Sequence, residues 1–183
     1  MTAVGLFGTA HVHLMPSIAA AFFSGGPETV GLLMSAGGLG AVICASYLSL
    51  QRGTARQRQL VTFGPLVLGL AIMAVSQSRH LPLTFLLFMI IGGAIMLTAA
   101  CTNIIVQQSV PEAWRGRAVS LYAMSFQGTG PIGHLLAGAI AARIGVGAML
   151  LLNGILIAVA AIVGRRLLQR HPEALDEPAR DKT

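Results

Sequence analysis

Charged residues are scarce in this chain. Only 10% of its 183 residues are Asp, Glu, Lys or Arg, whereas a soluble domain carries about 25%. Six stretches contain none of them: 1–27, 29–51, 59–78, 80–111, 118–142 and 144–164. About 20 apolar residues in a helix rise roughly 30 Å, the thickness of the hydrocarbon core of a bilayer. The scarcity of charge therefore excludes an ordinary soluble domain and predicts six transmembrane helices.

Residue types that catalysis or metal binding needs are also few. The two cysteines, Cys44 and Cys101, lie inside uncharged stretches and provide neither a disulfide framework nor a ligand cluster. The single lysine, Lys182, follows no glycine-rich phosphate loop, and no His-Glu-x-x-His sequence is present. Neither Ser35 nor Ser125 lies in the Gly-x-Ser-Gly context of an intramembrane serine protease. We therefore expect no enzyme, no catalytic residue, no metal site and no cofactor.

The predicted fold class is an all-α membrane protein with one membrane domain at residues 1–165. Its six transmembrane helices are expected at about 3–23, 30–50, 60–77, 83–110, 118–142 and 146–165. Residues 166–183 mix proline with charges, a composition that favours a disordered polar tail on the cytoplasmic side. The short connections leave no room for a soluble domain, so any functional site is expected between the helices.

The arginines between the spans are distributed unequally. The connections after spans one, three and five contain only Arg79 and Arg143. Those after spans two, four and six contain Arg52, Arg56, Arg58, Arg115, Arg117, Arg165, Arg166 and Arg170. Because positive residues favour the cytoplasmic side, this pattern predicts a multi-pass inner (plasma) membrane protein with both termini in the cytoplasm. The net charge of +6 is thus explained by topology, and we expect no nucleic acid partner.

Polar side chains inside the spans are the candidate functional residues, because they are costly in lipid. Gln127 and His134 are seven residues apart, so they share a face of a continuous helix, with Pro131 between them. They either line a translocation cavity or hydrogen-bond across a helix interface. Asn103 and Gln107 form a second candidate cavity pair, four residues apart. The alternative for this pair is a position near the lipid headgroups.

Two further histidines, His11 and His13, lie near Pro16 in the first span. Residues two apart point to different faces of a helix, so the pair would bind a metal only if the helix unwound near Pro16. The alternative is that one faces an aqueous cavity and the other packs at an interface. No Asp or Glu lies within a span. A coupled proton would therefore be carried by one of these histidines, by His134, or by another polypeptide segment.

Small residues and prolines indicate where helices approach closely or bend. Gly37, Ala41 and Ala45 are spaced four apart, as are Gly133, Ala137 and Ala141, and each set predicts a helix–helix seam. A proline within a helix removes a backbone donor and favours a kink. The predicted packing and hinge positions are Pro16, Gly37, Gly130, Pro131 and Gly133.

Several motifs follow one another in a characteristic order. The first half of the chain has Pro16, Gly31-Leu32-Leu33, Gly37-Gly38-Leu39-Gly40-Ala41 and a basic loop. Later come Asn103, Gln107, Pro111, the loop motif Arg115-Gly116-Arg117-Ala118-Val119-Ser120-Leu121, Gly130-Pro131-Ile132-Gly133, Gly138 and Gly145. In this order and spacing the chain resembles the C-terminal half of a major facilitator superfamily transporter. More narrowly, it resembles the bacterial enterobactin-exporter, macrolide-efflux and transmembrane secretion effector group.

The resemblance implies a six-helix half-bundle of a twelve-span carrier that exports small molecules by alternating access. The expected partners are a small-molecule substrate, the lipid bilayer, and a complementary six-helix half or a second copy of the chain. Arg115, Gly116 and Arg117 would then belong to a cytoplasmic loop motif. The alternative is a membrane interaction module that does not transport, or an inactive transporter fragment.

Overall fold

Every element that the structure describes is a helix. A computed structural model describes residues 4–50 and 54–170, and these ranges contain no strand. The helices are η1 (Val4–Gly8), α1 (Ala10–His13), α2 (Met15–Phe23), α3 (Pro27–Leu50), α4 (Thr54–Gln77), α5 (Leu81–Gln108), η2 (Glu112–Trp114), α6 (Arg115–Phe126), α7 (Gly130–Ile144) and α8 (Val146–Arg170). The all-α prediction is confirmed. Helix α8 continues past residue 166, where the tail was predicted to begin, and residues 171–183 lie outside the described residues.

Four helices are long and apolar enough to cross a bilayer. The qualifying segments are Pro27–Leu50, Arg56–Gln77, Leu81–Gln108 and Val146–Arg166. A bent pair, Val4–His13 with Met15–Phe23, would count as a fifth span. The predicted number of six spans is not confirmed. The remaining predicted span, 118–142, is divided into α6 and α7, of 12 and 15 residues, each shorter than the roughly 20 residues that one crossing needs.

The first break lies just before Pro16. The segments on its two sides, Val4–His13 and Met15–Phe23, are bent by 55°. Pro16 occupies the first turn of α2, where the missing backbone N–H leaves no hydrogen bond unmade. The Leu14 N–H donates to the His11 carbonyl at 3.2 Å, which tightens the last turn of α1. The bend separates the short segment that carries His11 from the longer helix α2.

The second break, between α6 and α7, also lies at a proline in the first turn of the following helix. Pro131 lies in the first turn of α7 and has no N–H to donate to the carbonyl of Gln127, four residues earlier. That carbonyl instead accepts from the Gly130 N–H at 3.2 Å. The prediction of one continuous helix over 118–142 is therefore wrong, because the chain forms two helices joined at residues 127–129.

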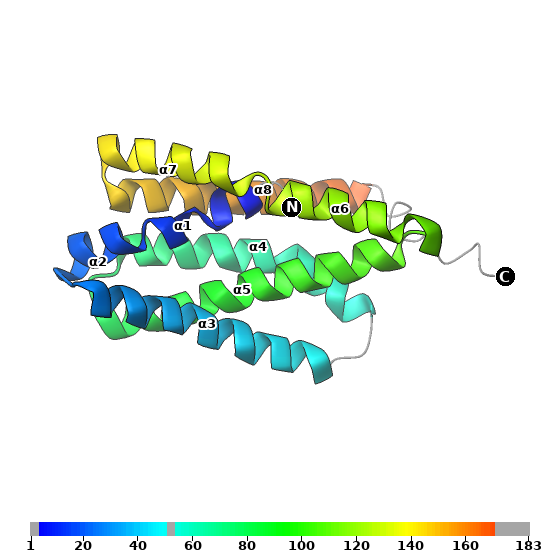
Figure 1. The fold of residues 1–183 in the computed structure, drawn as a ribbon, viewed down its shortest axis with the longest axis horizontal. Coiled ribbons are helices and arrows are strands. Elements are labelled where there is room, and N and C mark those ends of the chain that lie inside the picture. Colours follow the sequence, from blue (N-terminus) through cyan, green and yellow to red (C-terminus); the bar gives the residue numbers. More distant parts are fainter. Residues whose placement is uncertain (1–3, 51–53, 171–183) are drawn as a thin grey trace.

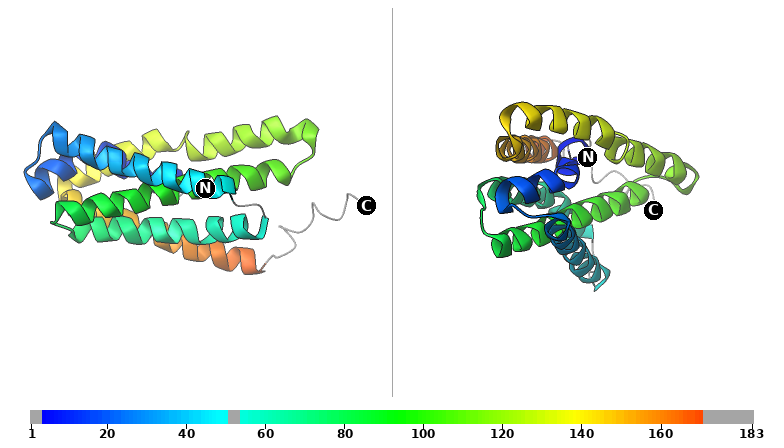
Figure 2. Two further views of the ribbon diagram at one scale, coloured as in Figure 1. Left: turned by 90° about the horizontal axis from the view of Figure 1, so that it is seen from below. Right: turned by 60° about the vertical axis from the view of Figure 1, so that its left-hand side comes forward.

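The long helices form an elongated bundle in which α3 packs on α5, α5 on α4, and α4 on α8 (Figure 1). Helix α7 packs on α8, and the N-terminal segment η1–α1 lies between α4 and α7. Helix α6 lies at one edge of the bundle, where it contacts α5 and η1 but buries none of its residues (Figure 2). The hydroxyl of Tyr122 in α6 donates to the Ala99 carbonyl of α5 at 2.9 Å and connects the two helices.

The ends of the helices agree with the arginine pattern. The end of α3, the start of α4, the end of α5, the start of α6 and the end of α8 lie at one end of the bundle (Figure 1). Arg56, Arg115 and Arg165 belong to these helix ends. Arg79 and Arg143, at the turns after α4 and near the end of α7, lie at the opposite end. The two sets of arginines are therefore separated by the length of the bundle.

Glycines set the closest helix contacts. A side chain at Gly40 of α3 would overlap the backbone of Met89 in α5, and one at Gly92 would overlap the backbone of Gly37. The predicted α3 seam is thus found at Gly37. The contact then continues through Gly40, whereas Ala41 lines a cavity. On α7 the predicted seam is buried: Gly133 abuts the backbone of Leu6, and Ala137 is 1% exposed.

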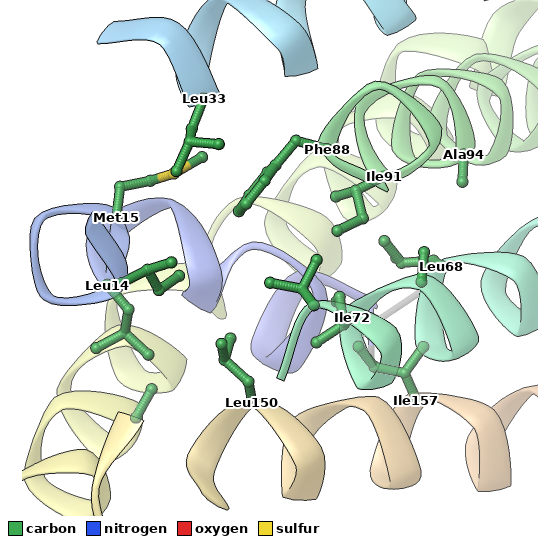
Figure 3. Close-up of a cluster of buried hydrophobic side chains, with 14 of the residues drawn as sticks. Leu14, Met15, Leu33, Leu68, Ile72, Phe88, Ile91, Ala94, Leu150 and Ile157 are labelled. Carbon is green, nitrogen blue, oxygen red and sulfur yellow. The ribbon is translucent and has the colours of Figure 1, made fainter. Parts of the chain in front are cut away.

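The core runs through the middle of the bundle, where α2, α3, α4, α5, α7 and α8 contribute buried apolar side chains (Figure 3) and α6 adds the partly buried Phe126. Met15 of α2, Leu33 of α3 and Phe88 of α5 converge on one side, and Ile72 of α4 faces Leu150 of α8 on the other. The outside is also apolar. Large apolar residues exposed on α3, α7 and α8 include Leu32, Met34, Leu39, Val42, Ile43, Ile132, Leu135, Val159, Ile162 and Val163. A bundle that is apolar inside and outside is suited to lipid.

Candidate functional site

A cavity of about 430 Å³ lies between the N-terminal segment, α3 and α5. Its walls are almost entirely apolar. The lining residues are His11, Val12, Met15, Met34, Gly37, Gly38, Ala41, Phe88, Ile91, Gly92, Ile95, Met96 and Ala99. A cavity of this size with apolar walls and a few polar groups is typical of a small-molecule site.

His11 is the one titratable side chain in this lining. Its side chain is buried, with 4% of the residue exposed, and its ring lies 5.8 Å from that of Phe88 between centroids. The Gly8 backbone is close enough to interact with the ring, yet Nδ1 of His11 makes no hydrogen bond. Because a buried polar atom without a partner is costly, this nitrogen is a candidate contact for a ligand.

A second histidine cluster joins α1 to α7. The rings of His13 and His134 are 3.9 Å apart between centroids, with an angle of 43° between their planes. Nε2 of His134 lies 3.0 Å from the Thr9 hydroxyl, which itself donates to the Gly5 carbonyl at 2.9 Å. Since a hydroxyl has one proton, Nε2 of His134 is the donor to Thr9, and its Nδ1 is left as an acceptor. His134 can therefore accept a proton without losing its bond to Thr9.

The two N-terminal histidines are thus directed to different places. His11 lines the cavity, whereas His13 is exposed and lies against His134. Among the described residues, no group of three or more His, Cys, Asp or Glu side chains is placed to hold a metal ion. This agrees with the alternative drawn from the sequence, in which one histidine faces a cavity and the other packs at an interface, because residues two apart point to different faces of a helix. Both histidines lie in α1, on the same side of the bend before Pro16. The sequence did not indicate which of the two would line the cavity.

The other predicted cavity residues do not line this cavity. Gln127 is exposed at the C-terminal end of α6 and is separated from His134 by the break at Pro131. The shared-face argument assumed one continuous helix and does not apply across this break. Asn103 and Gln107 bond to each other on α5, with the Gln107 amide donating to the Asn103 oxygen. Their role in translocation, like that of Gln127 and His134, stays a prediction.

The loop motif lies where α6 begins. Arg115 forms an ion pair with Glu112 at 3.9 Å, and the guanidinium of Arg117 lies 4.7 Å from the centre of the Trp114 ring. Both contacts are local to the short connection between α5 and α6. Gly116, between Arg115 and Arg117, has open space around it.

Comparison with known proteins identifies the family. The model of a family described as transmembrane secretion effectors, within the major facilitator superfamily, matches residues 1–183. The chain belongs to this family. The resemblance of its motifs to the facilitator exporters is therefore confirmed, and the chain is a membrane protein of the transporter kind.

A curated relative from Mycolicibacterium fortuitum is named multidrug efflux pump Tap. It is 29% identical over 145 residues, which cover 77% of this chain and 35% of the relative. The chain thus spans about a third of the length of the curated relative that it matches. No solved structure matches the chain.

Proposed function

We propose that this chain is one half of a secondary active exporter of small molecules. The observation that carries the proposal is the apolar cavity with the buried His11 in its wall. Membership of the transmembrane secretion effector family and similarity to an efflux pump support it. An apolar cavity suits molecules that partition into the membrane, and the imidazole of His11 is the polar side chain in its wall that would orient them.

The proposed bundle has six spans, two of which are broken. The first is η1–α1 with α2, and the fifth is α6 with α7. Irregular backbone inside a membrane is tolerated only beside protein or a water-filled cavity, and broken helices are typical of transporter binding sites. Both breaks lie close to the histidine cluster: Leu14 follows His13 directly, and Thr129 is five residues before His134. This arrangement supports a site at the breaks.

Transport would proceed by alternating access. In this mechanism the bundle rocks against a complementary six-helix bundle around a shared cavity. The complementary bundle could be the remaining part of a longer chain, a separate chain or a second copy. The bundle would sit in the inner (plasma) membrane with the arginine-rich end, and hence both termini, in the cytoplasm.

The test is an efflux assay in bacteria that lack their own major exporters. The chain is produced alone and together with the part of Tap that it does not match, and cells are loaded with the neutral dye N-phenyl-1-naphthylamine. We expect dye release that stops when a protonophore collapses the proton gradient, at least with the complementary part present. A chain that reaches the membrane but exports nothing in either setting would contradict the proposal and favour the non-transporting module. Co-purification with the Tap part and no export would identify that module as an interaction partner.

A further inference from the structure

The cavity wall has a composition that restricts what it can hold. Three methionines, Met15, Met34 and Met96, lie in it beside Phe88. Thioether side chains are flexible and polarisable, and they make favourable contacts with aromatic rings. Glycines Gly37 and Gly92 bring the backbones of α3 and α5 together at one side of the cavity. Such walls fit flat or irregular apolar molecules, aromatic ones in particular.

The cavity has no group that could neutralise a cation. No lining residue is acidic, and all six Asp and Glu residues lie outside the predicted spans. A permanent cation would lose its hydration on entering these walls without gaining a counter-charge, which is costly. The walls therefore favour neutral molecules.

His11 adds one point of polar recognition. Its Nδ1 is buried without a hydrogen-bond partner, although the residue lines the cavity. A neutral imidazole has one donor nitrogen and one acceptor nitrogen, so it can pair with either kind of group on a ligand. A ligand that supplies the missing partner would remove the cost of burying this atom.

From these observations we propose that the cavity is a binding site for neutral, largely aromatic molecules that carry one hydrogen-bonding group, and that His11 is the residue that selects for this group. This inference deepens the proposed function, on which its transport role rests, because it names the class of molecule that the exporter would take. Binding itself can be measured on the purified chain without transport.

The experiment compares two probes of the same shape. N-phenyl-1-naphthylamine has an N–H bridge between its rings, and 1-benzylnaphthalene has a CH2 group in the same place. Binding of each is measured on the full chain in nanodiscs by equilibrium partition, with empty nanodiscs subtracted. The permanent cation tetraphenylphosphonium is the third probe.

Matched variants test the site. A Cβ at Gly38 meets no atom within 4 Å and Gly38 lines the cavity, so Gly38→Leu should narrow the cavity without moving the helices. Gly31 has equally open space but does not line the cavity, so Gly31→Leu is the control. His11→Phe keeps a ring of similar size and removes both nitrogens. His80→Phe, at an exposed position before α5, is its control.

We expect Gly38→Leu to weaken saturable binding of both neutral probes and Gly31→Leu to leave it unchanged. His11→Phe should weaken the amine by about threefold to tenfold, the equivalent of one hydrogen bond, and leave the hydrocarbon unchanged. Equal binding by the Gly38→Leu variant would overturn the site. The selective role of His11 would be overturned if His11→Phe weakened the binding of both probes equally or changed the binding of neither. The cavity would then be an apolar site without polar selection, such as one for a lipid tail.

The preference for neutral molecules would be overturned if tetraphenylphosphonium bound as tightly as the amine and Gly38→Leu weakened its binding. These binding measurements do not depend on the efflux assay. Saturable, His11-dependent binding by a chain that exports nothing would keep this site and reject the proposed function.

Discussion

The imidazole rings of His13 and His134 lie 3.9 Å apart, in a contact between the N-terminal segment and α7. Thr9 extends this contact through its hydroxyl, which is 3.0 Å from Nε2 of His134. The pair connects α1, in the N-terminal segment, with α7. It provides a proton acceptor at the point where the helices are interrupted.

Replacing His134 or His13 with Ala should lower efflux by the assembled carrier and leave its abundance in the membrane unchanged. The physical reason is that no Asp or Glu lies within a predicted span, so a coupled proton in this bundle would be carried by a histidine. If His134 carries protons, its replacement should also flatten the pH dependence of efflux near the ordinary histidine pKa of about 6.5. Efflux is measured as dye release over a series of pH values.

The matched control for the pair is His80→Ala, which removes an exposed histidine from the turn before α5. It should leave both the rate and the pH profile as they are. Unchanged efflux in both cluster variants would assign the pair to helix packing, and so would a loss of abundance in both.

Gln127→Ala should reduce efflux without reducing abundance. Gln127 is exposed within this bundle, at the break between α6 and α7, and its amide is free to face a complementary half. Removing one hydrogen bond to a substrate or a facing helix corresponds to about a twofold to tenfold loss. Gln59→Ala, on the first half of α4, serves as the control. An efflux rate equal to that of the control would show that Gln127 takes no part in transport.

Gly40→Leu should lower the stability of the bundle. Any side chain here would meet the Met89 backbone, which cannot move aside as a flexible side chain can. Overpacking of this kind costs about 1–3 kcal/mol. The measurement is thermal unfolding in detergent with yield after size-exclusion chromatography. Gly31→Leu, which has open space around it, should behave like the unaltered chain. A variant at Gly40 with normal yield and melting temperature would mean that α3 and α5 do not touch there.

Cysteines placed at Arg56 and Arg115 should be labelled from the cytoplasm. Both arginines lie at the same end of the bundle, which the charge pattern assigns to the inside. The background needs Cys44→Ala and Cys101→Ala, and a cysteine at Arg143 is the control for the outer side. Strong labelling of Arg56→Cys or Arg115→Cys by an impermeant reagent added outside intact cells would reverse the topology.

Much of the fold follows from the sequence because the signals are local. Each uncharged run of about 20 residues indicates a span without reference to the rest of the chain. Helices α3, α4, α5 and α8 correspond to spans predicted in this way. The two breaks also have a local cause in Pro16 and Pro131. Their effect on the helices was harder to predict, since a proline can bend a membrane helix or end it. At Pro131 the turn closes through Gly130, so α6 and α7 are separate helices.

The candidate site depended on the tertiary structure. Thr9 and His134 are 125 positions apart, and no pattern within either segment indicates that they meet. The residues of the α3 seam could not be predicted from their spacing alone either. Residues spaced by four turn by roughly 40° per step around a helix, so they do not stay on one straight line. A straight contact between two helices therefore alternates steps of three and four residues. The partner helix determines which of these faces is used, and here it uses Gly37 and Gly40. The sequence by itself therefore determined which segments are helical and apolar, because that depends on each segment and its solvent. Only the packing of the helices decided that His11 lines a cavity and that His13 meets His134, because those contacts depend on every helix at once.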